Sequence, residues 1–203
     1  MEDPIMSLEF ANTLATFGTF VVIAATAVAA IVQLRHARTS NQITALNELR
    51  ETAETPDFQT ARHIVSSQLA AKLQDAAFRY QIATPSARND ETRHFWDSLR
   101  TIGNFYEGMG VLVKTGLVDR NLVIQMWVDN VIAMWEQIAP AAAIMRRRTG
   151  NVLWENFEYL TVLAQDWRDA HPTGSYPTGV RRIVLKDEWL EVDQRYAASL
   201  ATA

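Results

Sequence analysis

The sequence contains no cysteine among its 203 residues. This absence excludes disulfide bonds, thiolate metal sites and catalysis by a thiol nucleophile, and it suits a protein that folds in a reducing compartment. The sequence also lacks H-E-x-x-H, G-x-S-x-G, P-loop and G-x-G-x-x-G motifs, which carry common hydrolytic and nucleotide-binding chemistry. We therefore expect a protein that is not an enzyme and that uses no cofactor.

Histidine is scarce, with four residues in the whole chain. Only Glu91 and His94 have the Glu-x-x-His spacing that di-iron helical bundles use. Such sites need two of these motifs and two further glutamates, and the sequence has no second motif. We expect no metal site.

Lysine and arginine are absent before Arg35, and residues 10–34 carry no charge of either sign. A helix rises ~1.5 Å per residue and the hydrocarbon core of a bilayer is ~30 Å thick, so this stretch is long enough to span it with some tilt. The sequence predicts one transmembrane helix over residues 10–34, and the lipid bilayer is the first partner that we expect.

Two alternatives compete with a membrane span. Ala27 to Ala29 form an A-x-A site that could end a cleaved signal peptide, but signal peptides begin with a basic region that is missing here. A buried core helix usually keeps a polar stripe, which residues 10–34 lack. Both alternatives fit the pattern less well than a spanning helix.

The distribution of charge predicts how the chain is oriented. Glu2, Asp3 and Glu9 are the acidic residues before the apolar stretch, while all 19 basic residues follow it. Because basic flanks remain on the cytoplasmic side of membranes, we expect the N-terminus outside and everything after residue 34 in the cytoplasm. The remainder has a net charge near −1, which gives no basic face for nucleic acid.

The expected domain organisation follows from this orientation. It comprises a leader (1–9), the transmembrane helix (10–34), a helical stalk (35–54), a cytoplasmic helical domain (55–171) and a C-terminal tail (172–203). Apolar residues recur every three or four positions in the domain, which predicts an all-α, compact, antiparallel bundle-like fold. In the tail, 181–185 could be extended and 187–200 helical, and the sequence leaves open whether the tail packs.

Individual helix boundaries are also predicted. Thr55-Pro56-Asp57, Asn89 and Asp119 have the residue types that begin helices. After Asp119 we expect Leu122 and Met126 to face inward, and Pro140 to kink the helix or begin a new one.

Arg146 to Arg148 resemble a phosphate site, but cations at the end of a helix also suit its dipole. The last strong helix is expected from Asn151 to Ala170. Small residues every four positions in the membrane span, at Ala11, Ala15 and Thr19, would favour self-association.

Polar and aromatic residues alternate on two of the expected helices, and they are the candidate ligand or partner residues. If they turn inward they form a buried network or the floor of a pocket. The alternative is that they make structural hydrogen bonds between helices or face solvent. The candidates are Asn104, Tyr106, Glu107, Asn156, Glu158 and Tyr159.

Several of these stretches also carry a resemblance. The sets at 104–108, 111–119 and 155–160, with Trp127 and Trp135, resemble an uncharacterised bacterial domain-of-unknown-function family of small proteins. The resemblance covers most of Phe10 to Trp167 and implies one N-terminal transmembrane helix and a cytoplasmic helical domain. It carries over no catalytic residue.

These observations favour a membrane-anchored, non-enzymatic interaction or scaffold module that binds a protein partner or itself. One alternative is an accessory subunit of a membrane protein complex, in which the span itself docks. Another is a small-molecule sensor with a pocket between the helices that carry Asn104 and Glu158.

Overall fold

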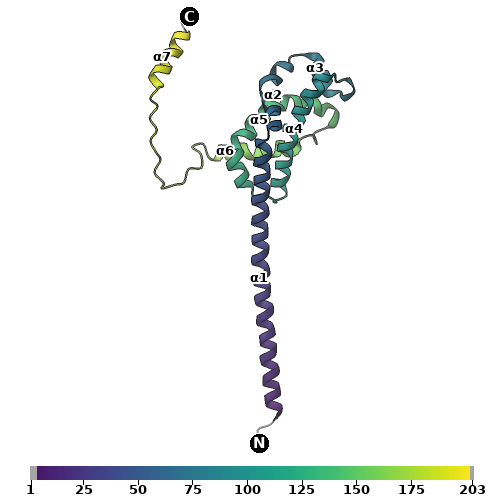
Figure 1. Cartoon of the computed structure of the whole chain (residues 1–203), viewed down its shortest axis with the longest axis vertical. Helices are drawn as coiled ribbons and strands as arrows, with labels where there is room; N and C mark the ends of the chain where they lie inside the picture. Colours follow the sequence, from purple (N-terminus) through teal and green to yellow (C-terminus); the bar gives the residue numbers. More distant parts are fainter. Residues whose placement is uncertain (1–3, 202–203) are drawn as a thin grey trace. The chain divides into compact units, whose positions relative to one another are not determined.

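The computed structural model describes the backbone of residues 4–201 and the side chains of residues 10–200. Every regular element within that range is helical, and none is a strand, so the fold is all-α as predicted (Figure 1). The helices are α1 (Pro4–Glu54), α2 (Pro56–Lys72), α3 (Ala76–Ala83), the short 3-10 helix η1 (Pro85–Ala87), α4 (Asp90–Lys114), α5 (Arg120–Thr149), α6 (Glu155–Ala170) and α7 (Leu190–Ala201).

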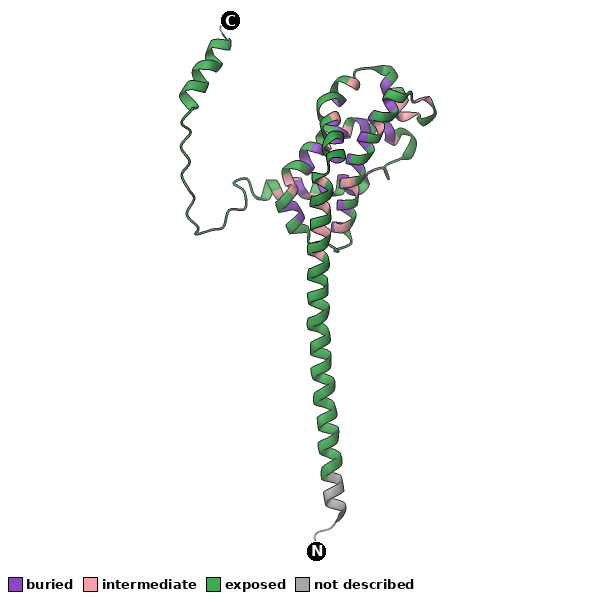
Figure 2. Ribbon diagram, in the orientation of Figure 1, coloured by how far each residue is buried: buried purple, intermediate pink, exposed green. Residues whose placement is uncertain are grey.

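Helix α1 contains both the predicted span and the predicted stalk without a break. Its side chains are exposed from Phe10 to Asn41 (Figure 2), so the apolar part of α1 is not a core helix of this chain. Further along, Leu46 and Leu49 pack against the domain. The helix is long and apolar enough to cross a membrane.

A sharp break at Thr55 separates α1 from α2. The Thr55 hydroxyl accepts a hydrogen bond from the Phe58 N–H (3.3 Å), and Pro56 occupies the first helical turn. Asn89 caps α4 and Asp119 caps α5 through the same kind of side-chain acceptor. All three predicted helix starts are confirmed.

Helices α2 to α6 bury one hydrophobic core. Helix α6 lies against both α4 and α5, while α2 packs on α4 and α3 on α5. Burying apolar faces of this kind is the main favourable contribution to folding. The largest fully buried side chains include Leu69, Ile82, Leu99, Met109, Ile138 and Phe157.

Helix α5 continues through Pro140 to Thr149, so of the two alternatives predicted for this proline, a new helix is the one that does not occur. The buried Ala141 and Ala142 that follow hold the chain against the core, which offsets the backbone hydrogen bond that proline removes. At the other end, Leu122 and Met126 are 47% and 50% exposed, whereas the sequence predicted that they face inward.

Helix α6 begins at Glu155, four residues later than predicted. Residues 151–154 form a turn, and Trp154 has φ +54, a backbone conformation that interrupts the helix. The turn places the Trp154 side chain in the core, where it is 3% exposed. Helical periodicity could not predict the burial of Trp154, because this residue lies in the turn before α6.

Residues 171–203 form a separate compact unit. The stretch 181–185, which could have been extended, has no regular secondary structure, and α7 starts at Leu190 rather than at 187. Its side chains are exposed through Leu200. Tyr176 donates a hydrogen bond from its hydroxyl to the Arg181 carbonyl (3.1 Å), a contact within this unit.

Candidate functional site

Glu107, on α4, binds the first turn of α6. One carboxylate oxygen accepts hydrogen bonds from the N–H groups of Asn156 and Phe157, both at 2.9 Å. The other oxygen accepts from the Asn156 side-chain amide at 2.6 Å. Three donors therefore converge on one carboxylate.

This arrangement satisfies a general need of helices. The first N–H groups of an α-helix have no partner within it, and an anion there also interacts favourably with the helix dipole. Residues near the start of a helix usually provide the cap, but in this protein Glu107 provides it from a neighbouring helix. Glu107 thus fixes the position of α6 on α4.

Asn156 extends the contact to the end of α4. Its side-chain oxygen accepts a hydrogen bond from the Lys114 ammonium at 3.1 Å, and Lys114 also lies 3.9 Å from the Glu155 carboxylate. Asn156 itself is buried, with 8% of its surface exposed. The polar atoms of this side chain are therefore hydrogen-bonded to residues of α4 and not to solvent.

Trp154 and Asn104 form the next contact along the same interface. The indole N–H of Trp154 donates to the Asn104 side-chain oxygen at 3.2 Å. The ring lies where a side chain at Gly103 would project, so only glycine fits there. A positive φ at a bulky residue costs roughly 1–3 kcal/mol, and ring burial with this hydrogen bond offsets that cost.

Arg146 ties the end of α5 to the same turn. It donates two hydrogen bonds to the Leu153 carbonyl (2.9 and 2.8 Å) and pairs with Glu158 at 2.7 Å. Its side chain is 16% exposed, whereas the neighbouring Arg147 and Arg148 are exposed. Of the two interpretations of the arginine run, the structural one fits Arg146.

Tyr106 and Tyr159 have different environments. Tyr106 is buried and stacks on Phe157, with ring centroids 4.6 Å apart. Burial raises the pKa of the Tyr106 hydroxyl to about 12, against a smaller opposing effect of the charge on Arg62. Tyr159 is 36% exposed and remains accessible to a partner.

The structure brings together most of the predicted polar and aromatic candidates at the junction of α4, α6 and the end of α5. Hydrogen bonds between helices use the polar groups of Asn104, Glu107 and Asn156. This geometry favours the structural alternative for them, while a partner-binding role stays a prediction for Tyr159. Sequence reasoning missed Trp154 and Lys114.

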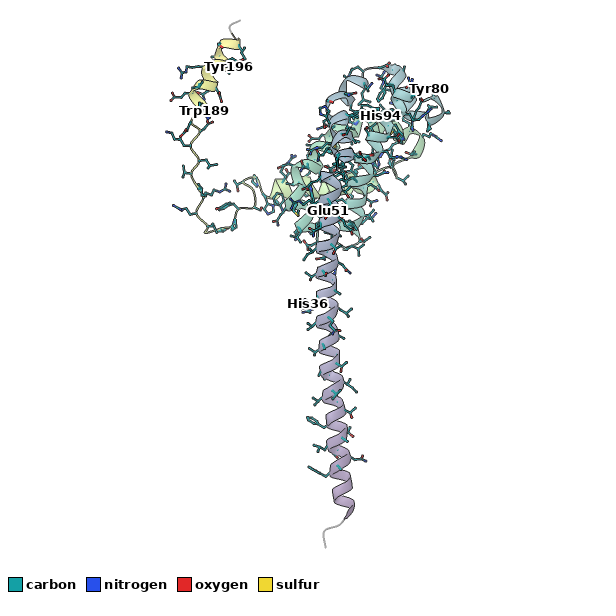
Figure 3. The ribbon with its side chains drawn as sticks, viewed as in Figure 1. His36, Glu51, Tyr80, His94, Trp189 and Tyr196 are labelled. Atoms are coloured by element: carbon teal, nitrogen blue, oxygen red, sulfur yellow. The ribbon has the colours of Figure 1, made fainter. Side chains whose placement is uncertain are left out.

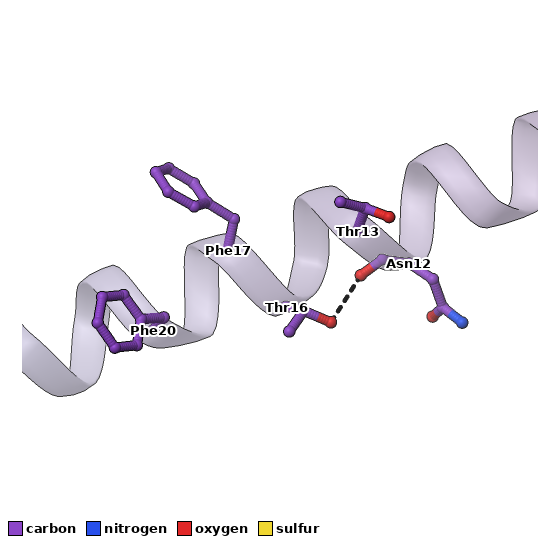
Figure 4. A pocket seen from close by; sticks show the side chains of 5 residues that line it. All are labelled: Asn12, Thr13, Thr16, Phe17 and Phe20. Atoms are coloured by element: carbon purple, nitrogen blue, oxygen red, sulfur yellow. Dashed lines mark hydrogen bonds between the residues drawn. The ribbon is translucent and has the colours of Figure 1, made fainter.

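The apolar part of α1 carries a shallow groove with polar side chains, shown in Figure 4. The Thr16 hydroxyl donates to the Asn12 carbonyl at 2.8 Å, and Thr19 and Thr26 make the same bond one turn back. These hydroxyls are satisfied by their own helix, which suits an apolar surrounding. The lining residues are Asn12, Thr13, Thr16, Phe17 and Phe20.

A second cleft, of about 180 Å³, lies between α3, α4 and the end of α5. Arg88 and Arg148 line it, together with Trp96 and Met145. The Arg88 guanidinium lies 3.9 Å from the centre of the Trp96 ring. Partial burial and then the charge of Arg148 lower the pKa of Arg88, against the opposing charge of Asp97. Apolar walls and two like charges suit an anion with an apolar body.

No group of histidine, aspartate and glutamate that could hold a metal ion occurs among the described residues. Residues 20–167 match the family model described as a domain of unknown function, DUF4760. No curated protein and no solved structure matches the sequence significantly.

Proposed function

Because the chain belongs to the DUF4760 family, a domain of unknown function, we propose its function from its own geometry. It is a single-pass protein of a bacterial plasma membrane, with its N-terminus outside and its helical domain in the cytoplasm. The domain is a non-enzymatic interaction or scaffold module. The observation that carries the proposal is a single helix that joins a fully exposed apolar stretch to a packed domain.

The charge pattern supports this orientation. The exposed, uncharged stretch is followed at once by Arg35 and Arg38. This is the pattern of a span with a basic flank on the cytoplasmic side. The continuity of α1 into the stalk also argues against cleavage near Ala29, because cleavage would remove the anchor and leave the stalk alone.

The absence of cysteine makes the topology test direct, since any introduced cysteine is the only one. Ser7→Cys should react with a membrane-impermeant maleimide in intact cells, and Asn47→Cys only after permeabilisation. The protein should also resist extraction by alkaline carbonate and keep its full mass. The reverse labelling pattern, release by carbonate or loss of the first residues would refute the proposal.

The interaction role is supported by α7, which presents an apolar face. Val192, Tyr196 and Leu200 are at least half exposed and recur every four residues, and the exposed Trp189 lies three residues before Val192, just before the helix. Faces with this spacing bind hydrophobic grooves on partner proteins.

A photo-crosslinking residue at position 189 should therefore give a discrete adduct in native membranes. Replacing both Val192 and Tyr196 with serine should abolish the adduct, and the control Gln194→Ser, on the same helix, should not. An adduct that survives the double substitution would count against an interaction through α7.

The sensor alternative was predicted with a pocket between the helices of Asn104 and Glu158. The cleft at Arg88 and Arg148 lies elsewhere, and it favours a sensor of small anionic molecules. Phenyl phosphate or benzoate should then raise the melting temperature of the detergent-solubilised protein and of the control Arg147→Gln. Arg148→Gln should remove that rise. If neither probe changes the melting temperature of the unsubstituted protein, the sensor alternative fails.

A further inference from the structure

The connection between α4 and α5 lies close to the end of the apolar stretch of α1. Arg38 donates a hydrogen bond from its guanidinium to the Gly116 carbonyl at 3.3 Å. Arg38 is the fourth residue after Leu34, the last of the uncharged stretch. Residues 116 and 34 are far apart in the sequence, so only the fold reveals this proximity.

The distance along α1 can be compared with the dimensions of a bilayer. Four residues of helix correspond to ~6 Å. Headgroups extend a bilayer from ~30 Å of hydrocarbon to ~40–45 Å in total, which is ~5–7 Å on each side. If Leu34 marks the hydrocarbon edge, the Gly116 carbonyl lies at the depth of the headgroups.

The exposed side chains of this connection suit that depth. Leu117 and Leu122 are 60% and 47% exposed, although both are large apolar side chains. Lys114 and Arg120 are exposed beside them, close in sequence to Gly116. Apolar tips between basic residues are typical of segments that lie in a membrane interface.

The acidic groups of the same region are engaged within the protein. The Asp119 carboxylate accepts hydrogen bonds from the N–H groups of Asn121 (2.9 Å) and Leu122 (3.1 Å). Glu155 lies 3.9 Å from Lys114 and offsets part of its charge. With Arg35 and Arg38 on α1, basic charge exceeds acidic charge at this end of the domain, and basic residues are attracted to an anionic lipid surface.

We propose that the α4–α5 connection and the adjoining helix ends, residues 114–122, insert Leu117 into the headgroup layer of the membrane that α1 spans, with Arg38 and Arg120 at anionic lipid headgroups. This inference rests on the proposed membrane span. The contact holds the domain against the membrane surface, so that the domain does not swing freely on its stalk.

Single-cysteine variants labelled with a nitrobenzoxadiazole dye test the contact, in vesicles of phosphatidylcholine and phosphatidylglycerol. Leu117→Cys reports on the connection and Val22→Cys on the span. Tyr80→Cys is the matched control, because Tyr80 is 63% exposed and Leu117 is 60% exposed. Figure 3 places Tyr80 at the end of the domain away from His36 on α1.

The expected result is a shift to shorter emission wavelength and a loss of intensity with spin-labelled headgroups for Leu117→Cys, and neither change for Tyr80→Cys. Val22→Cys should lose intensity with acyl-chain spin labels. If Leu117→Cys behaves like Tyr80→Cys while Val22→Cys is quenched, the contact is refuted and the span stands. If Val22→Cys is not quenched, the span itself is refuted.

A second measurement tests the role of charge. Arg38→Gln with Arg120→Gln, in the Leu117→Cys background, should weaken headgroup quenching in the anionic vesicles, while the helical content by circular dichroism stays the same. Undiminished quenching in this variant would refute the electrostatic part of the proposal.

Discussion

Single carboxylates and amides organise the junction between α4 and α6. Glu107 receives three hydrogen bonds at the start of α6, and Asn156 links that start to Lys114. A hydrogen bond made by such a half-buried group adds little to the free energy of unfolding. Removing the group costs more, because its partners are left without a hydrogen bond. Substitutions at such residues should therefore lower the free energy of unfolding more than their partial exposure suggests.

Glu107→Ala should lower the free energy of unfolding by about 1–3 kcal/mol, because it leaves the N–H groups of Asn156 and Phe157 without an acceptor. Chemical unfolding of the detergent-solubilised protein, followed by circular dichroism, measures the change. Glu136→Ala is the matched control, since Glu136 is exposed on α5 and its side chain makes no hydrogen bond or ion pair in the described part of the chain. Equal stabilities of the two variants would contradict the capping role.

Tyr106 should make stability depend on pH in the alkaline range. The pKa of its hydroxyl is raised to about 12 in the folded protein, against ~10 in an unfolded chain. Between these values the unfolded chain releases a proton that the folded protein keeps, so stability is intact below pH ~10 and falls as the pH rises towards 12. The loss should approach ~1.4 kcal/mol per pH unit at most.

Unfolding titrations at several pH values measure this slope. Tyr106→Phe is the comparison, because it removes the titrating hydroxyl and keeps the ring that stacks on Phe157. A slope that is the same with and without the hydroxyl would show that other groups cause the pH dependence.

At the scale of elements, glycines determine how closely α4 approaches its neighbours. A side chain at Gly103 would collide with the Trp154 ring, and one at Gly110 with the backbone of Asn156, whereas Gly108 faces open space. Gly103 and Gly110 lie about two helical turns apart on one face. Two of these three glycines therefore allow a neighbouring segment to approach α4 closely.

Alanine substitutions at these glycines should act in opposite directions. Gly108→Ala should raise the free energy of unfolding by about 0.5–1 kcal/mol, because alanine favours helix and meets no neighbour. Gly103→Ala and Gly110→Ala should lower it by about 1–3 kcal/mol through overpacking. Melting temperatures of the three variants test the ranking, and a stabilising effect of Gly110→Ala would contradict the close contact with Asn156.

At the scale of the whole molecule, α1 divides into an exposed part and a packed part. Its side chains are exposed up to Asn41, while Ala45, Leu46 and Leu49 pack against the core. A fragment of residues 42–170 should therefore fold in buffer without detergent and unfold cooperatively.

A shorter fragment of residues 55–170 lacks the packed part of α1 and should be less stable by about 1–3 kcal/mol, from the apolar surface that it leaves uncovered. Gel filtration and circular dichroism measure solubility and unfolding of both fragments. Aggregation of the 42–170 fragment would mean that the domain depends on residues before Gln42.

Much of the fold could be predicted because it depends on local properties. Helix starts at Thr55, Asn89 and Asp119 depend on residue type within a few positions, and the structure confirms them. The start of α6 could not be predicted in this way, because the turn at Trp154 is held by contacts with Gly103 and Asn104 on another helix. The same holds for Leu122 and Met126, whose exposure depends on which face of α5 the other helices cover.

The candidate site was predicted only in part, for a related reason. Alternation of polar and aromatic residues identified Glu107 and Asn156 as residues that could meet, but not what they would do. To predict that Glu107 binds the start of α6, one must know that residues far apart in the sequence are adjacent in space. The periodicity of one helix contains no information about the distance to the next.

The sequence alone determined that the chain is helical and that its first helix is apolar and long enough to cross a membrane, because periodicity, capping residues and uncharged length are local. Only the tertiary structure decided that Glu107 caps α6, that Trp154 lies over Gly103, and that Arg38 contacts Gly116. These three contacts join distant segments, and the packing of the whole core selects them.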